Sequence, residues 1–387
     1  MRAMKKILVV HTTYRNIGGE DIAVNNEIKL LQKYFHVEKL FFSNNDKNFI
    51  RDLISLLFNK NSFSKKLLKD KLKLFQPDII YVHNTWYKPS LEIFDLIKDQ
   101  NTINILKLHN FRYSCTKSFF SKRHLNGKQI CPACGYKKKP LSIFNKYFNE
   151  SYFKSLFAIL YGKKYLNIIK NLDFVFVLTD FHKNFLRDKN YRNKEIINLP
   201  NYIEIKENNY TKKPKDYFIY AGRISEEKGI KDLIKSFQIS NFSDIYLKIV
   251  GDGPELNKLK TKYHDINIEF TGFRENKEVL DLISDSLGVV TATTLYEGQP
   301  TLLCEASLLE VPSIFPINGG IAEFFPENYK FSYDQSNPDD LSEKMIELSK
   351  NNNSELYGKE CKKFILDKLN EDKLISKFQE IIGSHER

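Results

Sequence analysis

The stretch Leu295-Tyr296-Glu297-Gly298-Gln299-Pro300-Thr301-Leu302-Leu303-Cys304-Glu305 follows the apolar run Gly288–Thr294. The run is rich in β-branched residues, as a buried parallel strand is, and Pro300 is a typical first residue of a helix. The stretch therefore predicts a strand, a glycine turn and a helix, the repeating unit of an α/β fold. The free amides and positive dipole end of that helix would face any phosphate beyond the edge of the sheet.

Two carboxylates flank the start of this predicted helix. Thr301 and Glu305 are four residues apart and so share one helical face, on which side chains lean toward the N-terminus. We expect Glu305 to lean back toward a bound ligand while Glu297 reaches another part of it from the loop. Carboxylates accept hydrogen bonds from sugar hydroxyls, so the segment suits a sugar joined to a phosphate. Two surface glutamates around a core helix would show the same spacing.

Length and composition indicate a globular protein of about two domains. The chain has 387 residues, 42% of them hydrophobic, and no apolar run long enough to cross a bilayer. The apolar run Ile7–Val10 ends at His11 and is too short for a signal peptide, so we expect a cytoplasmic protein. Five cysteines, an odd number, fit a reducing compartment better than a disulfide framework.

The formal net charge of +12 favours an anionic partner such as a nucleotide, a nucleic acid or an anionic lipid surface. The excess of lysine accompanies abundant Asn, Ile, Phe and Tyr, as in a chain encoded by an AT-rich genome. The lysines would then only solvate the surface.

Strand-like runs alternate with helical patterns in both halves of the chain. In the first half the strand-like runs are Lys6–His11, Asp78–His83, Ile103–His109 and Asp173–Thr179. In the second half they are Tyr217–Ala221, Tyr246–Val250, Ile268–Phe270, Gly288–Ala292 and Pro312–Phe315. The alternation predicts two Rossmann-like, doubly wound α/β domains with a ligand cleft between them, at the carboxyl ends of the strands.

The polar stretch Asn201–Pro214 marks the crossover between the halves. We expect one domain at residues 1–205 and a second at 206–370. Residues 371–387 should add a helix that packs back on the first domain, because the apolar residues from Leu374 to Ile382 recur at helical spacing.

Glycines and cations follow several predicted strands. Arg223 and Lys228 surround one turn and suit a diphosphate, whose charge they would neutralise without a metal. Gly251 and the pair Gly272-Phe273 follow the next two strands, where a nucleotide base would lie. Gly18-Gly19 lets the backbone approach a phosphate or sugar, and His109 ends a strand where it would hydrogen-bond a sugar. Each feature alone is common in surface turns.

In order, these motifs resemble the retaining glycosyltransferases of family 4. The matching motifs are Gly222-Arg223 with Lys228-Gly229, Gly251-x-Gly253-Pro254, Thr271-Gly272-Phe273, Glu297 with Glu305, and Asn318-Gly319-Gly320-Ile321-Ala322-Glu323. The first half matches less closely, through Gly18-Gly19-Glu20, His109-Asn110, the run from Asp173 to Phe181, and Leu199-Pro200-Asn201.

The resemblance implies a GT-B fold, with the acceptor on the first domain and a UDP- or GDP-linked sugar on the second, without metal or other cofactor. It assigns the diphosphate to Arg223 and Lys228, the ribose to Glu305, and the donor sugar to Glu297. The implied catalytic residues are His109, Glu297, Arg223 and Lys228, and the implied donor-binding residues are Gly18, Gly19, Gly251, Gly272, Phe273, Gly298, Gln299, Pro300, Thr301, Leu302 and Glu305. It also implies an α-linked product made by front-face displacement, in which the leaving phosphate oxygen helps to deprotonate the acceptor.

One motif departs from the family pattern. Many members read Glu-Gly-Phe-Gly where this chain reads Glu297-Gly298-Gln299-Pro300. Gln299 would change the contacts to the sugar, so the resemblance does not identify the donor.

Cys115, His124, Cys131 and Cys134 supply ligands enough for a structural zinc, although reduced, packed cysteines fit the same residues. Two basic segments, Asn48–Phe75 and Lys137–Leu166, interleave lysine with apolar residues. They suit either helices of the first domain or the anionic inner face of a membrane, where a lipid-linked acceptor would lie.

The leading hypothesis is a retaining hexosyltransferase that extends a cell-surface polysaccharide from a saccharide or lipid-linked acceptor. We do not expect nucleic acid as a partner. One alternative is a GT-B sugar-nucleotide epimerase, which would interconvert donor sugars without an acceptor. Another is a basic protein that binds glycan or nucleic acid without turnover, with strong salt dependence.

Overall fold

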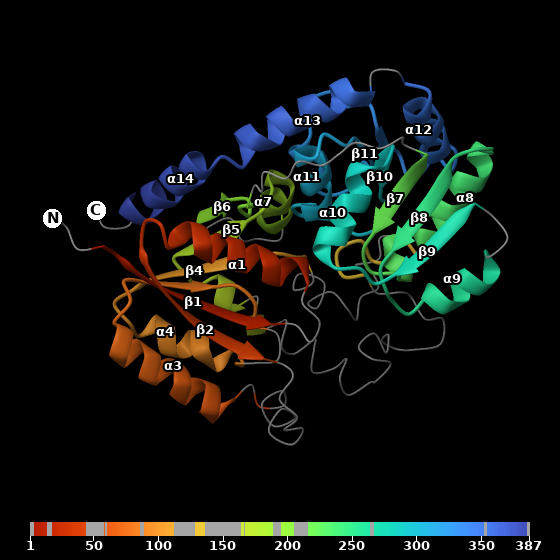
Figure 1. The fold of residues 1–387 in the computed structure, drawn as a ribbon. Helices are drawn as coiled ribbons and strands as arrows, with labels where there is room; N and C mark the ends of the chain where they lie inside the picture. Colours follow the sequence, from red (N-terminus) through yellow and green to blue (C-terminus); the bar gives the residue numbers. More distant parts are fainter. Residues whose placement is uncertain are drawn as a thin grey trace. The chain divides into compact units, whose positions relative to one another are not determined.

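The computed structural model describes residues 4–13, 18–43, 58, 60–85, 89–111, 128–135, 164–165, 167–188, 195–204, 216–263, 267–351 and 354–384. The chain forms two compact units, Met1–Ile203 with Glu371–Arg387, and Glu204–Asn370. Each unit contains a parallel six-stranded sheet with helices on both faces (Figure 1). The predicted fold class, α/β with two doubly wound sheets, is confirmed.

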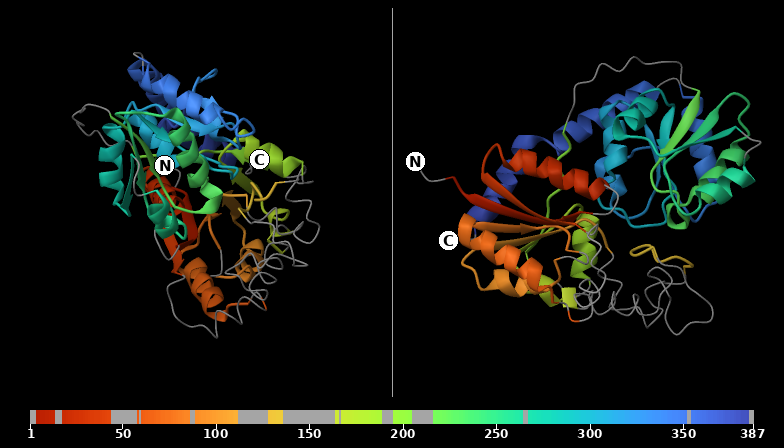
Figure 2. Two further views of the ribbon diagram at one scale, coloured as in Figure 1. Left: turned by 90° about the vertical axis from the view of Figure 1, so that its right-hand side faces the viewer. Right: turned by 60° about the horizontal axis from the view of Figure 1, so that its bottom comes forward.

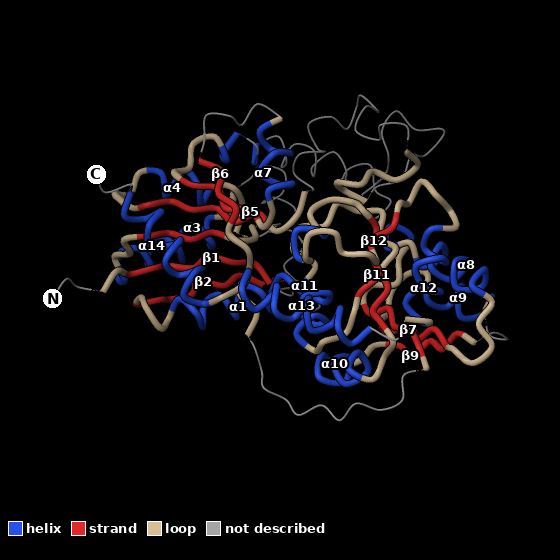
Figure 3. The backbone as a smooth tube through the Cα atoms, turned by 90° about the horizontal axis from the view of Figure 1, so that it is seen from above, coloured by secondary structure: helices blue, strands red, loops and turns tan. Residues whose placement is uncertain are grey.

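The sheet of the first unit has the strand order β2-β1-β3-β4-β5-β6 (Figure 3). Its strands are β1 (Lys6–Thr13), β2 (His36–Ser43), β3 (Ile79–Val82), β4 (Ile103–Leu108), β5 (Phe174–Val177) and β6 (Glu195–Asn198). Its helices are α1 (Gly19–Leu31), α3 (Ser62–Phe75), α4 (Glu92–Lys98), α7 (Asp180–Arg187) and α14 (Glu371–Ser384).

Successive side chains of the first sheet enter two separate cores, as strand geometry requires. Ile7 and Val9 of β1 pack with side chains of α1 and α14, whereas Leu8 and Val10 pack with α3 and α4. Figure 2 shows α1 and α3 on opposite faces of this sheet. All four side chains are fully buried, which explains the continuous apolar run of the first strand.

The sheet of the second unit has the strand order β12-β11-β10-β7-β8-β9. Its strands are β7 (Tyr217–Ala221), β8 (Tyr246–Val250), β9 (Ile268–Gly272), β10 (Gly288–Val290), β11 (Ser313–Pro316) and β12 (Ser332–Tyr333). Its helices are η3 (Glu226–Lys228), α8 (Ile230–Ser240), α9 (Leu256–Lys262), α10 (Asn276–Ser284), α11 (Thr301–Leu308), η4 (Ile321–Phe324), α12 (Asp340–Ser349) and α13 (Ser354–Lys368). The side chains of α8 and α12 share one core, while α10 contacts β7 and α11 contacts β11.

The sequence pattern missed β2, β6 and β12. All three are edge strands of their sheets. An edge strand is partly exposed and carries polar residues, as in His36-Val37-Glu38-Lys39 of β2, so it lacks the apolar run by which a central strand is found.

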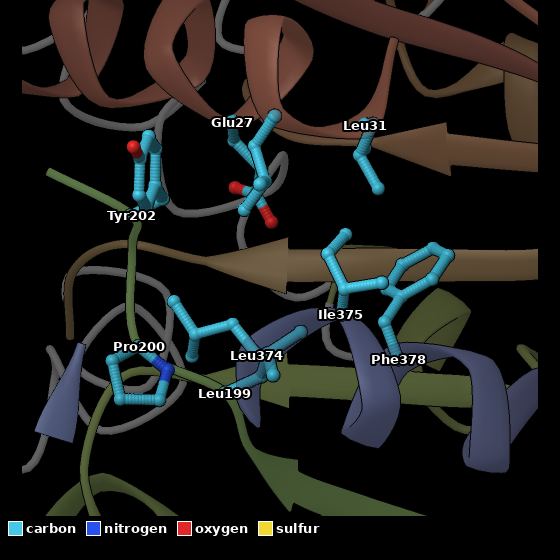
Figure 4. A pocket seen from close by; sticks show the side chains of 9 residues that line it. Glu27, Leu31, Leu199, Pro200, Tyr202, Leu374, Ile375 and Phe378 are labelled. Carbon is cyan, nitrogen blue, oxygen red and sulfur yellow. The ribbon is translucent and has the colours of Figure 1, made fainter. Parts of the chain in front are cut away.

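The helix α14 completes the core of the first unit, although it follows the second unit in sequence. Leu374, Ile375 and Phe378 lie in the same buried cluster as the α1 side of the sheet. At its start, Glu371 accepts hydrogen bonds from Lys33 Nζ at 2.6 Å and Tyr34 Oη at 3.1 Å. Figure 4 shows the small pocket, of about 10 Å³, that remains where α1, α14 and the chain after β6 meet.

A buried ion pair lies beside this pocket. Lys107 Nζ donates to both carboxylate oxygens of Glu27 at 2.9 Å and to the carbonyl of Pro200 at 3.4 Å. Tyr81 Oη donates to the same carboxylate at 2.7 Å. The Lys107 side chain is fully buried, and burial lowers its pKa despite the opposing effect of Glu27. Desolvation therefore affects the pKa of Lys107 more than Glu27 does. Removal of either partner would leave the other charge buried without compensation.

No described helix combines the length and the apolarity that a membrane-spanning segment needs.

We predict that Glu27→Gln destabilises the first unit by about 3–5 kcal/mol, because it leaves the Lys107 ammonium buried against a neutral amide. The triple variant Glu27→Leu, Lys107→Met and Tyr81→Phe removes the charges and the hydroxyl together and should recover most of that loss. Urea unfolding followed by fluorescence of the single tryptophan, Trp86, reports on this unit. Equal destabilisation in the single and triple variants would contradict the prediction.

Candidate functional site

The strand order of the second sheet reverses between β7 and β10, which are neighbours although β8 and β9 intervene in sequence. Connections from two strands that run to opposite sides leave a crevice at their carboxyl ends, where open α/β sheets bind ligands. The loops after β7 and β10 are therefore the first place to search. They carry Arg223, Lys228 and Glu297.

A glycine lets these two loops touch. Gly229 has a φ of +69°, and a Cβ there would lie 1.9 Å from the carbonyl oxygen of Ala292. The backbone N–H of Thr294 and its hydroxyl both donate to the carbonyl of Glu227 at 3.0 Å. Side chains on η3 are thereby held against the residues that follow β10.

The contact brings Lys228 and Glu297 together, which their distance in sequence did not reveal. Lys228 Nζ donates to Glu297 Oε1 at 2.5 Å, and Thr293 Oγ1 donates to the same oxygen at 3.3 Å. Each of the two charged side chains is 28% exposed. A ligand at the crevice can thus reach a cation and a carboxylate side by side.

The backbone of Glu297 is held by the loop after β11. Gly320 N–H donates to the carbonyl of Glu297 at 2.8 Å, and Asn318 Nδ2 donates to the carbonyl of Leu295 at 3.1 Å. Gly319 has a φ of +67°, and a Cβ there would lie 2.7 Å from the Glu297 nitrogen. The motif from Asn318 to Gly320 therefore acts as a backbone brace for the Glu297 loop.

Arg223 lies at the surface of the loop after β7. Its side chain is exposed, while its carbonyl accepts a hydrogen bond from Tyr220 Oη at 2.9 Å. The next loop packs directly beside it, because a Cβ on Gly251 would lie 1.9 Å from the carbonyl oxygen of Gly222 and one on Gly253 would lie 2.2 Å from that of Ile224. These glycines hold the turn that presents Arg223.

The loops after β8 and β9 are also joined. Gly251 N–H donates to the carbonyl of Gly272 at 2.9 Å, and Gly272 has a φ of +73°. Phe273 follows with 74% of its surface exposed. An exposed aromatic ring at the end of a parallel strand is a suitable platform for a flat ligand group.

The helix α11 begins at Thr301, so Pro300 is its N-cap residue and not its first helical residue as predicted. Cys304 N–H donates to the Pro300 carbonyl at 3.0 Å, which closes the first turn from that residue. Gly298 and Gln299 are buried, whereas Thr301, Leu302 and Glu305 are partly exposed. Asn276 Nδ2 lies 3.5 Å from Glu305 Oε1, so α10 contacts this carboxylate.

The remaining predicted site residues lie in the first unit. Gly18 precedes α1, and its N–H donates to Asp21 Oδ2 at 2.9 Å; Gly19 is the first residue of the helix. His11 Nε2 lies 2.9 Å from the other oxygen of this carboxylate. With Asp21 already beside the glycine amide, the turn favours a neutral sugar over a phosphate.

His109 directly follows β4, and its Nε2 lies 3.0 Å from Nδ1 of His83, which directly follows β3. His11, Asp21 and His83 were not predicted as site residues from the sequence. A signal was present, because three predicted strands of the first half each end in a histidine.

The zinc prediction concerns residues of which only two are described. Cys131 and Cys134 are both buried in one short turn. Cys115 and His124 lie outside the described residues, as does most of the basic segment Lys137–Leu166. The described part of the chain holds no group of three or more metal-ligating side chains.

Comparisons with known proteins find glycosyltransferases among the similar chains. Residues 201–365 match the family model for glycosyl transferases group 1. The chain is 26% identical over 318 residues to MJ1069, an uncharacterized glycosyltransferase of Methanocaldococcus jannaschii, and the match covers 76% of this chain and 80% of the relative.

Solved structures share the fold. Sucrose-phosphate synthase from Thermosynechococcus elongatus superposes with a TM-score of 0.70 at 14% identity, over 98% of each chain. The Anabaena protein Alr3699/HepE, in its complex with UDP-glucose, superposes with a TM-score of 0.69 at 14% identity, over 98% of this chain and 99% of that one. The chain therefore has the GT-B fold of these glycosyltransferase structures, and its residues 201–365 are similar to glycosyl transferases group 1.

Proposed function

We propose that this protein is a retaining, metal-independent glycosyltransferase that moves a hexosyl group from a UDP- or GDP-linked donor to a saccharide acceptor in polysaccharide synthesis. The observation that carries the proposal is the pairing of Lys228 with Glu297 across the loops after β7 and β10. A cation for the diphosphate and an acceptor for sugar hydroxyls then stand within one donor molecule's reach of each other.

In this proposal the second unit binds the donor. Arg223 and Lys228 hold the diphosphate and neutralise the charge that grows on it as the bond to the sugar breaks. Glu297 accepts hydrogen bonds from the sugar hydroxyls. The first amides of α11 stand behind the phosphate, and Glu305 accepts hydrogen bonds from the ribose.

The reaction needs no nucleophile from the protein if the acceptor attacks the face from which the phosphate leaves. The leaving phosphate oxygen then takes the acceptor's proton. The Anabaena protein of the same fold has been solved with UDP-glucose, which supports a nucleoside diphosphate sugar as donor. The basic surface described below supports an acceptor linked to lipid.

We predict that Lys228→Met and Glu297→Gln each lower kcat/KM by about tenfold to a hundredfold, because each removes a charge-assisted hydrogen bond to the donor. They should differ in nucleotide binding. Lys228→Met weakens binding of UDP or GDP alone, whereas Glu297→Gln does not, because its role is with the sugar. Sugar transfer assays and isothermal titration with the free nucleotide measure the two effects.

Lys362→Met is the matched control, because Lys362 pairs with Glu310 beyond the far end of α11 at 2.9 Å. It should retain wild-type transfer. Unchanged transfer in both site variants would refute the assignment of the pair. Strong salt-dependent binding of nucleic acid without sugar turnover would favour the non-enzymatic alternative instead.

We predict that Glu305→Ala removes the preference of the protein for a ribonucleotide. The wild-type protein should bind UDP or GDP more tightly than the 2′-deoxy form, by about tenfold, since a carboxylate hydrogen bond to a hydroxyl is lost. The variant should bind both forms equally. Thermal shift and titration with the paired nucleotides decide the point, and an unchanged preference in Glu305→Ala would place the ribose elsewhere.

The proposal includes a peripheral position on the inner face of an anionic membrane. The buried face of α3 enters the core of the first unit through Leu68, Leu72 and Phe75. Its outer face carries exposed Leu67 and Leu74, the latter with 84% of its surface exposed. These two leucines are seven residues apart, hence on one helical face.

Lysines lie on one side of this outer face of α3, together with the exposed Asp70. Lys66, Lys69 and Lys73 are exposed. Lysine near an anionic leaflet contributes about 1 kcal/mol of binding per residue, and exposed leucines add apolar contact with the lipid. The same helix thus serves the core of the unit on one face and suits a membrane surface on the other.

We predict that the protein floats with vesicles that contain phosphatidylglycerol and not with phosphatidylcholine vesicles. Lys66→Glu, Lys69→Glu and Lys73→Glu together should lower the bound fraction at least tenfold. The control reverses three exposed lysines of α9, Lys258, Lys260 and Lys262, with the same change in net charge. If both triple variants lost vesicle binding equally, the binding would depend on net charge alone, and a specific membrane-binding surface on α3 would be refuted.

A further inference from the structure

Three histidines of the first unit stand at the carboxyl ends of neighbouring strands. His11 lies in β1, His83 follows β3 and His109 follows β4. Side chains alternate along a strand, so these rings project to the same face as side chains an even number of residues before them. Those side chains, Val9, Tyr81 and Ile105, all belong to the core on the α1 side.

Two of the rings form a direct hydrogen bond. His83 Nδ1 lies 3.0 Å from His109 Nε2, and the ring planes are inclined by only 26°. A hydrogen bond between two neutral imidazoles requires one N–H and one bare nitrogen. The bond therefore ties the proton position of one ring to that of the other.

Both rings are neutral near pH 7. Burial lowers the pKa of His83 and of His109 well below the usual value, and the nearby Lys107 ammonium lowers each further. Each ring then carries a single N–H. Either His83 donates from Nδ1, or His109 donates from Nε2.

The surroundings of His83 Nε2 show which of the two rings is the hydrogen-bond donor. His83 Nε2 is sealed from solvent and has no hydrogen-bond partner among the described residues. If His109 were the donor, His83 would carry its proton on Nε2, as an orphaned buried N–H. Orphaned buried donors are rarer in proteins than orphaned acceptors, so the proton belongs on Nδ1.

We propose that His83 is a positioning residue that fixes His109 as its Nδ1–H tautomer. Nε2 of His109 is then occupied as the acceptor, and Nδ1 carries the only N–H of the ring. His109 is half-buried, and its Nδ1 is not among the sealed atoms without a partner. His109 therefore offers a ligand a hydrogen-bond donor, not a base.

The remaining histidine does not compete for this role. His11 is fully buried, and its Nε2 faces the Asp21 carboxylate, so that nitrogen carries the proton. Its Nδ1 is sealed as an acceptor. His11 thus anchors the start of α1, and of these three described histidines only His109 presents an N–H to a ligand.

The effect of this tautomer on sugar transfer rests on the proposed function. A donor at His109 Nδ1 selects a sugar oxygen with a free lone pair, such as that of a hydroxyl group. It does not deprotonate the acceptor, which leaves that step to the leaving phosphate. His83 would therefore affect the donor sugar and not the nucleotide.

The test observes the tautomer itself. Long-range ¹H–¹⁵N spectra of the full-length protein with ¹⁵N-labelled histidine distinguish the Nδ1–H from the Nε2–H tautomer, and loss of one spin system in His109→Gln assigns it. We expect Nδ1–H at His109 in the wild type. His83→Asn, whose amide N–H takes the place of Nδ1–H, should keep that tautomer, whereas His83→Leu should lose it.

A wild-type His109 with its proton on Nε2, or an Nδ1–H that persists in His83→Leu, would overturn the inference.

Steady-state kinetics provide a second test of the role of His83. His83→Leu should lower kcat/KM for the donor roughly three- to tenfold without changing the Kd of free UDP, and His83→Asn should recover the loss. If no nucleotide sugar is turned over while the tautomers are as expected, the proposed function fails and the assignment of the proton stands.

Discussion

The site of the second unit depends on the contact between Gly229 and the carbonyl oxygen of Ala292. A side chain at Gly229 would collide with that oxygen at 1.9 Å, so the loops after β7 and β10 can meet only at a glycine. Their contact brings Lys228 to Glu297, and Gly319 holds Glu297 from the other side. The strand order of the parallel sheet creates the crevice. Close backbone contacts at the glycines determine which charged side chains lie beside it.

The two units differ in the charge and exposure of the side chains at the ends of their strands. The crevice residues of the second unit are charged and partly exposed, as Lys228 and Glu297 are, which suits a ligand that brings its own charge. The first unit instead buries one ion pair, Glu27 with Lys107, on the α1 side of its sheet and leaves His109 neutral at the end of β4. Neutral donors and acceptors suit sugar hydroxyls, for which a full charge would add desolvation cost without a matching partner.

Much of the fold could be predicted from sequence, because central parallel strands such as β1 and β10 are continuous apolar runs bounded by turn residues. Edge strands such as β12 have no such run and were missed. Single residues of the candidate site were predicted from glycines and cations after strands. Their partnerships were not, because no local spacing relates Lys228 to Glu297 or His83 to His109. Those contacts arise from strand order, which periodicity does not contain.

The placement of α14 has a consequence for biosynthesis. The first unit lacks one layer of its core until Leu374, Ile375 and Phe378 leave the ribosome. At about 5–20 residues per second, synthesis of the second unit, Glu204–Asn370, separates the rest of the first unit from α14 by roughly 8 to 33 seconds. During that interval the side of the first sheet that carries Lys107 is covered by α1 but not yet by α14. The core of the first unit is therefore completed only after the second unit has been synthesised.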